Sequence, residues 1–214
     1  YAFEVRLPEQ FVGQPLEAGK ASAKFEISVI DTADHKETIR KNLSVSASPI
    51  IIAAVPESGE LVPGLENKVY IVTTYADAKR ASCKVTWNNP PDGGKRTVTT
   101  DEAGFAEITL TPGEGNVPEI SLTAEDTKGH RGQAKVQLKT REAVGDDSIL
   151  VRTDKSLRRV GDPVGITVIS TRRTGTAYLD VIKDRQTYLT RTLEIKEGKA
   201  TTSISLDALL AGTI

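Results

Sequence analysis

The residues best suited to nucleophilic or metal chemistry in this 214-residue sequence are its single cysteine, Cys83, and its two histidines, His35 and His130. A cysteine nucleophile needs a base that converges on it in space. No histidine lies near Cys83 in the sequence, and Cys83 falls inside an expected strand. We therefore expect a small buried or half-buried thiol without a catalytic role.

Each histidine ends a polar turn, and the two turns resemble each other. The first is Asp31-Thr32-Ala33-Asp34-His35 and the second is Asp126-Thr127-Lys128-Gly129-His130, 95 positions further on. Alternating, strand-like runs flank each turn, at residues 24–30 and 39–46 and at residues 119–125 and 134–140. A strand, a short polar turn and a strand predict a β-hairpin. A hairpin that recurs after 95 residues predicts an array of similar domains.

The repeat makes the histidines turn residues of separate domains. We expect their imidazoles to donate hydrogen bonds to loop carbonyls, because one metal ion joining the two turns would require an improbable fold. Asp146-Asp147 could hold calcium at a domain junction, but Ser46-Ala47-Ser48 at the other junction has no carboxylate, which favours solvated linker charge. No catalytic, cofactor-binding or metal-ligating residue is predicted, and the chain is not expected to be an enzyme.

Two further patterns could serve binding or modification. Asn42-Leu43-Ser44 is a glycosylation sequon, although it lies on an expected strand. Five arginines form a loosely basic neighbourhood that Asp154 and Asp162 offset, which predicts a solvated face with a possible acidic partner. These arginines are Arg152, Arg158, Arg159, Arg172 and Arg173.

Composition narrows the class of protein. Lysine and arginine total 28 against 29 acidic residues, so the chain lacks the positive excess that nucleic-acid binding favours. The longest apolar run, residues 50–55, is too short to span a bilayer. One cysteine allows no internal disulfide. The chain shows no signal sequence and does not begin with methionine, so we expect a fragment of a longer protein.

The expected fold class is all-β, with immunoglobulin-like antiparallel β-sandwiches in tandem. Seven short strands in residues 48–141 predict one complete sandwich. Residues 1–47 predict part of a domain with about three strands, the first at residues 2–7. Residues 142–214 repeat the order of the central strands but stop before the final hairpin. Helices are expected to be few, with one turn at residues 206–210.

Several of these motifs resemble those of the alpha-2-macroglobulin and complement superfamily. Residues 149–164 resemble its strand ending in Thr-Asp-Lys-x-Leu-Tyr and followed by a Gly-Asp turn, although Arg158 replaces the tyrosine. The two histidine turns look like its Asp-Thr-x-Gly-His hairpin, with Asp34 in place of the glycine. An aspartate tolerates a left-handed backbone better than most residues do. Residues 63–75 and 100–106 also resemble its macroglobulin domains.

The resemblance covers nearly the whole chain. It implies the end of one macroglobulin domain (1–47), a complete second (48–141) and most of a third (142–214), in a secreted or periplasmic protein. Family members trap proteases with a bait region and a Cys-Gly-Glu-Gln thioester. Cys83 is followed by Lys-Val-Thr, so it is not that cysteine. The implied role is a non-catalytic scaffold of a broad-spectrum protease inhibitor, with target proteases met through regions outside this segment.

Two other functions remain open. An immunoglobulin-like stalk or adhesion array of a secreted or surface protein would have the same fold, and an anchoring signal downstream would favour it. An accessory module of a secreted hydrolase would carry an aromatic strip for sugars, and the single Trp87 with scattered tyrosines offers little of that kind.

Overall fold

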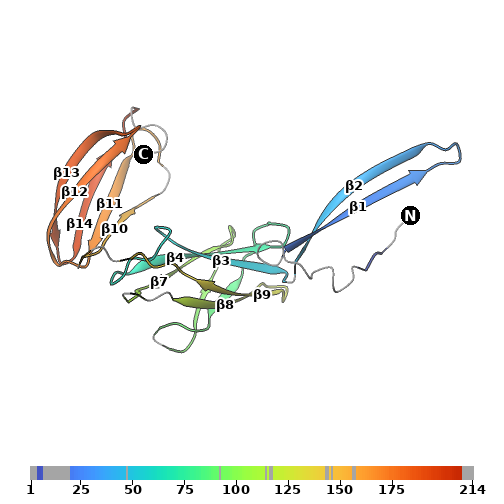
Figure 1. Ribbon diagram of the computed structural model, residues 1–214, viewed down its shortest axis with the longest axis horizontal. Helices are drawn as coiled ribbons and strands as arrows, with labels where there is room; N and C mark the ends of the chain where they lie inside the picture. Colours follow the sequence, from blue (N-terminus) through green and yellow to red (C-terminus); the bar gives the residue numbers. More distant parts are fainter. Residues whose placement is uncertain are drawn as a thin grey trace. The chain divides into compact units, whose positions relative to one another are not determined.

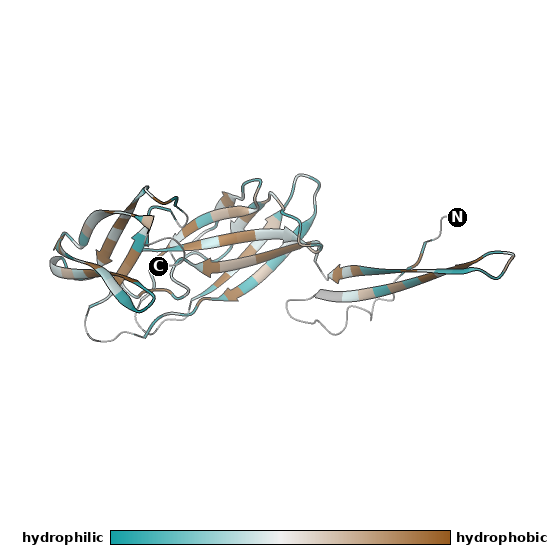
Figure 2. Cartoon of the chain, turned by 90° about the horizontal axis from the view of Figure 1, so that it is seen from above, coloured by the Kyte–Doolittle hydropathy of each residue, from teal (hydrophilic) through white to brown (hydrophobic). Residues whose placement is uncertain are grey.

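The computed structural model describes residues 4–6, 20–46, 48–91, 93–113, 115, 118–142, 145, 147–155 and 158–208. These residues form fourteen strands in four sheets and no α-helix (Figure 1), which confirms the all-β class. Hydrophobic and hydrophilic residues alternate along the strands (Figure 2), as the sequence predicts for sheets with one buried face. None of the described segments is a helix long and apolar enough to cross a membrane.

The first sheet is a single hairpin of β1 (Lys20–Ile30) and β2 (Lys36–Ser46). Its strands pair antiparallel from Lys20 opposite Ser46 to Ile30 opposite Lys36. The expected strand at residues 2–7 lies largely outside the described residues, and residues 4–6 are not in a strand.

The next seven strands form two sheets, of three and four strands. The order is β3-β4-β7 in one and β6-β5-β8-β9 in the other, the strand number and two-sheet plan expected for residues 48–141. Their bounds are β3 Ile50–Pro56, β4 Asn67–Tyr75, β5 Lys84–Trp87, β6 Arg96–Thr99, β7 Phe105–Leu110, β8 Glu119–Glu125 and β9 Arg131–Gln137.

The last five strands lie in one sheet, in the order β10-β11-β14-β13-β12. The repeat predicts strands at β10, β11, β12 and the start of β14, but the 11-residue strand β13 has no counterpart of that length in the preceding domain. Glu197 and Gly198 join β13 to β14 with φ angles of 53° and 79°, the geometry of a two-residue type I′ turn. Such a turn keeps both strands in one sheet. The bounds are β10 Ile149–Thr153, β11 Pro163–Ser170, β12 Thr174–Lys183, β13 Gln186–Lys196 and β14 Lys199–Ser205.

This five-stranded sheet is curled (Figure 1), and strands that are not neighbours in it share a core. Val164 and Ile166 of β11 cluster with Val181 of β12, although β14 and β13 separate these strands in the sheet. The curl explains how one sheet buries aliphatic side chains without a second sheet facing it.

The chain divides into two compact units whose limits differ from the expected domain limits. The first contains residues 1–55, 70–108 and 119–137, and the second contains residues 56–69, 109–118 and 138–214. The second unit therefore contains both the loop after β3 and the C-terminal sheet. The division into segments 1–47, 48–141 and 142–214 stays a prediction.

Candidate functional site

The Asp126 turn is a densely hydrogen-bonded polar group of the first unit. Asp126 Oδ1 accepts hydrogen bonds from the backbone nitrogens of Lys128 (2.8 Å) and His130 (2.9 Å). Its Oδ2 lies 2.8 Å from His130 Nδ1. The backbone closes the loop with bonds from Asp126 N to His130 O and from Gly129 N to Asp126 O. The side chain of one aspartate therefore organises the whole β8–β9 turn.

The Asp31 turn repeats this geometry atom for atom. Asp31 Oδ1 accepts from the nitrogens of Ala33 (2.8 Å) and His35 (3.0 Å), and Oδ2 lies 3.0 Å from His35 Nδ1. Asp34 takes the place of Gly129 at a φ of 63°, the left-handed conformation inferred from the sequence. The imidazoles were predicted to bond loop carbonyls. Instead Nδ1 of each ring lies within hydrogen-bond distance of the carboxylate that begins its own turn.

The two turns differ in what surrounds them. The Asp126 side chain is 2% exposed, whereas that of Asp31 is 54% exposed. Tyr75 of β4 donates a 2.8 Å hydrogen bond to Asp126 Oδ2, and its ring meets that of His130 edge-on at 6.2 Å. The second turn is thus tied to the neighbouring sheet through a buried carboxylate.

Hydrogen bonding controls the ionisation of this group. Burial acts to raise the pKa of Asp126, but the bonds from His130, Tyr75 and the two backbone nitrogens outweigh it and hold the pKa well below 3.8. The same contact with Asp126 raises the pKa of Tyr75 above 10.0. The trio is a structural clamp, since the Asp126 carboxylate holds both the Tyr75 hydroxyl and His130 Nδ1.

Cys83 lies where the sequence places it, as a small buried residue. It is 2% exposed, and burial raises the pKa of its thiol above 9.0. Its backbone nitrogen bonds the Thr100 hydroxyl, which shares a buried network with Thr73. A buried thiol with a raised pKa is poorly suited to nucleophilic attack.

The junction between the second and third expected domains is held by an ion pair that sequence reasoning missed. Arg152 of β10 forms two hydrogen bonds of 2.6 Å to Glu57, in the loop after β3. The Glu57 side chain is 7% exposed and also accepts a bond from Lys68 N. Burial acts to raise the Glu57 pKa, yet Arg152 and Lys68 bring it below 4.5. The two residues are 95 positions apart, so no local pattern signals the pair.

An apolar cluster adjoins this ion pair in the second unit. Val62 and Leu65, from the loop before β4, pack with Leu150 of β10 and Ile169 of β11. Leu150 is 2% exposed, although it lies on the sheet face opposite the core residue Val168. The outer face of the C-terminal sheet is therefore fastened to the loop that leads into β4.

The other charged candidates pair internally. Arg158 bonds Asp154 and Arg172 bonds Asp147 at 2.6 Å, so these two arginines, like Arg152, have acidic partners within the chain. Asp146 lies outside the described residues. Among the residues that the structure describes, no group of three or more His, Cys, Asp or Glu side chains could hold a metal ion. Asn42 of the sequon is exposed on β2.

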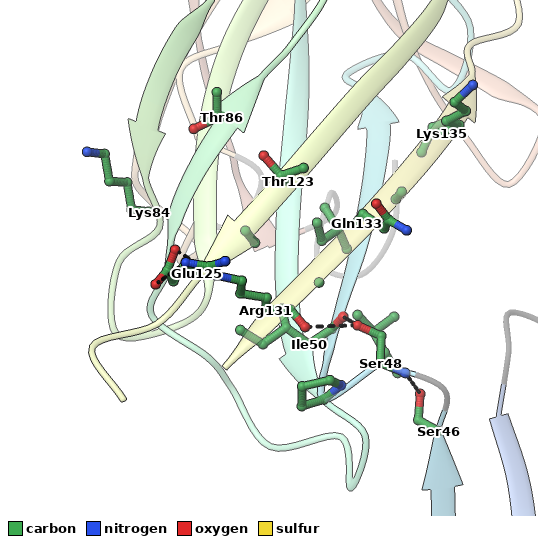
Figure 3. Close-up of a pocket in the computed structure, with 17 residues that line it drawn as sticks. Ser46, Ser48, Ile50, Lys84, Thr86, Thr123, Glu125, Arg131, Gln133 and Lys135 are labelled. Atoms are coloured by element: carbon green, nitrogen blue, oxygen red, sulfur yellow. Dashed lines mark hydrogen bonds and ion pairs between the residues drawn. The ribbon is translucent and has the colours of Figure 1, made fainter. Parts of the chain in front are cut away.

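An open groove of about 1010 Å³ lies in the first unit, where β3 begins beside β9 (Figure 3). The Ser48 hydroxyl lies 3.0 Å from the carbonyl oxygens of both Ile50 and Arg131, which fixes one wall. Lys84, Thr123 and other polar side chains of the outer sheet face line the rest, with an ion pair between Arg131 and Glu125. Its charges are of both signs, so the groove favours no single class of charged ligand.

Comparison with known proteins gives no match to a family model and none to a curated protein. Solved structures of two bacterial alpha-2-macroglobulins are similar to this chain. The native E. coli protein is 11% identical with a TM-score of 0.29, over 88% of this chain and 15% of its own. The Salmonella protein reacted with methylamine is 10% identical with a TM-score of 0.29, over 88% of this chain and 14% of its own. The chain thus spans about one seventh of the length of either.

Proposed function

We propose that this chain is a non-catalytic scaffold segment of an alpha-2-macroglobulin-like protease trap. The observation that supports this is the recurrence of one Asp–His hairpin after 95 residues, in the same register and within antiparallel sheets. It accompanies the ordered turn motifs that resemble macroglobulin domains. The aspartates of both turns and the Glu57–Arg152 pair form their hydrogen bonds within the chain. Such a segment suits a structural role, in which it positions other regions of the protein.

The scaffold would act by transmitting movement across the junction. Glu57 and Arg152 form a half-buried, bidentate pair, and the Leu150 cluster packs beside it. A planar guanidinium fixed by two bonds resists rotation more than a single contact does. When a bait region elsewhere in the protein is cut, this junction would carry the rearrangement between adjacent domains.

The remaining assignments follow from this role. The segment would have no enzymatic activity of its own and would need no cofactor. Its direct partners would be neighbouring macroglobulin domains, and target proteases would be met through other parts of the protein. The protein would be secreted, or periplasmic in a bacterium.

The test uses the full-length protein encoded by the gene from which this chain derives. A trap inhibits cleavage of large protein substrates while its captured protease still cleaves small peptides. A thioester, where one is present, incorporates methylamine. Inhibition of both substrate sizes, or of neither, contradicts the trapping role. Adhesion to cells without any protease effect would instead support the immunoglobulin-like stalk.

A separate variant tests whether the Glu57–Arg152 pair transmits the rearrangement. Arg152→Ala leaves a buried glutamate without its cation and should weaken trapping, while methylamine incorporation stays unchanged. Arg172→Ala is the matched control, because its pair with Asp147 is 61% and 40% exposed. Equal effects of the two variants would show that the junction does not transmit the rearrangement.

A further inference from the structure

The outer edge of β9 faces the open groove of the first unit. β9 ends its sheet, with β8 as its one neighbour among the described strands. Backbone hydrogen bonds alternate between the two sides of an antiparallel strand. Asp126 N bonds His130 O and Leu138 N bonds Pro118 O, so the even-numbered residues of β9 turn their backbone groups toward β8. The odd-numbered residues therefore point their N–H and C=O groups away from β8 and into the groove: they are Arg131, Gln133 and Lys135.

The Ser48 hydroxyl agrees with this direction. It lies 3.0 Å from the Arg131 carbonyl oxygen, to which it donates a hydrogen bond. Figure 3 shows Ser48 at the Arg131 end of β9, with Gln133 and Lys135 further along the strand. The lining of the groove comes from the segment before β3 and from β3, β5, β8 and β9. An edge that opens into a groove in this way is a template for an added strand.

The groove also has an apolar side. Ile50 and Ile52 of β3 line it, together with Ala134 and Val136 of β9. Ala134 and Val136 are only half-buried, whereas Leu122, which lies opposite Ala134 on β8, is 1% exposed. A strand added to β9 would place every second side chain over this apolar side.

The outward side chains of β9 decide which strand fits the edge. Its two charged residues, Arg131 and Lys135, are both basic, and their side chains are 76% and 74% exposed. Their partners Glu125 and Glu119 lie on β8, away from the edge. The groove as a whole carries both signs, but an added strand would lie directly opposite β9 alone. Acidic side chains on that strand would form cross-strand pairs, whereas a second copy of β9 would bring like charges together.

We propose that the edge of β9 binds an extended segment of another polypeptide, which joins the four-stranded sheet as an antiparallel fifth strand. Acidic side chains of the segment face outward, toward Lys135 and Arg131. Aliphatic side chains alternate with them and lie over Ala134 and Val136. Backbone hydrogen bonds to the edge supply affinity, and the alternating side chains supply selectivity. Such binding does not depend on whether the protein traps proteases.

A synthetic peptide and the 214-residue chain provide the test. The probe is the fluorescently labelled peptide Thr-Val-Glu-Val-Asp-Val-Thr, which carries the required alternation. Fluorescence anisotropy should show saturable binding. In the proposed pairing the N–H groups of its two acidic residues bond β9, so N-methylation of those two residues should weaken binding by about tenfold or more. A peptide with lysine in place of both acidic residues should also bind more weakly.

Two pairs of variants separate strand addition from simple charge attraction. Gln133→Pro removes an N–H that points into the groove but leaves the β8–β9 hydrogen bonds in place, and should weaken binding by about tenfold. Gln133→Ala keeps that N–H and is its matched control. Lys135→Glu should weaken binding by about fivefold. Lys84→Glu makes the same change of charge on β5, two strands from the edge, and should bind the peptide as the wild type does.

Amide hydrogen exchange of the wild-type chain locates the bound peptide. The amides of Ala134 and Val136 already face β8, so binding should slow exchange chiefly at Gln133 and Lys135. Circular dichroism checks that each variant stays folded. If Gln133→Pro unfolds, the N-methylated peptide and the exchange measurement still decide.

The proposal is overturned if the unmodified peptide does not bind, if its N-methylated form binds equally well, or if exchange at Gln133 and Lys135 does not slow. Equal losses for Lys84→Glu and Lys135→Glu would also overturn it, because they would indicate attraction to the basic groups of the whole groove. Self-association of the chain that protects the same two amides would assign the edge to a second copy instead.

Discussion

The β8–β9 hairpin and the β1–β2 hairpin pair their strands in the same register and close with the same aspartate-centred turn, but they differ in burial. The Asp126 side chain is 2% exposed and bonded to Tyr75, whereas the Asp31 side chain is 54% exposed. The aliphatic residues of the two hairpins also differ in burial, since Leu122 is 1% exposed and Ile27 is 37% exposed. A local motif thus fixes the shape of a hairpin, while its neighbours decide how much that shape contributes to stability.

The largest difference is expected from truncating the aliphatic face. Leu122→Ala should lower the free energy of unfolding by about 3 kcal/mol, because it opens a cavity in a closed core. Ile27→Ala, at the corresponding position, should cost less than about 1 kcal/mol, because its side chain already meets water. Chemical denaturation of monomeric protein measures both. Equal costs would mean that the β1–β2 face is covered in solution.

Removing the turn carboxylates should give the next largest difference. Asp126→Ala leaves two backbone nitrogens and the Tyr75 hydroxyl without their acceptor in a buried site, and should lower Tm by about 5 °C or more. Asp31→Ala exposes its donors to water and should lower Tm by about 1 °C. Thermal melts followed by circular dichroism compare the two. A comparable fall for Asp31→Ala would contradict the role assigned to burial.

Acid should distinguish the wild type from Asp126→Asn. The folded-state pKa of Asp126 lies below its ordinary value of 3.8, so the carboxylate stabilises the fold fully above that value. That stability is lost as the pH falls from 3.8 toward the lower folded-state pKa. The unfolding free energy of the wild type should decline in this window, and that of Asp126→Asn should decline less. Parallel curves would exclude Asp126 as the titrating group.

The smallest effect concerns the left-handed position of each turn. Gly129, at a φ of 82°, tolerates this conformation without strain, and Gly129→Ala should cost about 1 kcal/mol. Gly129→Asp should cost about half as much, because aspartate already fills the position in the other turn. Asp34→Gly should change stability by less than about 0.5 kcal/mol, since relief of strain is offset by a more flexible unfolded chain. Urea titrations resolve the order of these three variants.

Much of the fold follows from local pattern. Alternation predicts β8 at its observed bounds and β1 and β2 within a few residues, and the Asp–His spacing predicts both turns. The long strand β13 was not predicted, because its five-stranded sheet depends on a two-residue turn that joins it to β14. The expected start of β9 was three residues late, since Gly132 and Gln133 interrupt the apolar alternation.

The candidate site was less predictable. The Glu57–Arg152 pair joins residues 95 positions apart, and neither lies in a motif that calls for the other. The ion pairs of Arg158 and Arg172 could not be assigned from the sequence either, because sequence shows charge but not the distance between charges.

The sequence alone determined the all-β class, the positions of the two aspartate turns and the left-handed conformation at Asp34, because strands and turns depend on residues within a few positions of one another. Tertiary structure alone decided which carboxylate is buried, which aliphatic face is covered and which ion pair holds the junction. Burial and long-range pairing depend on strands that meet only after the chain has folded, so identical local motifs acquire unequal energies.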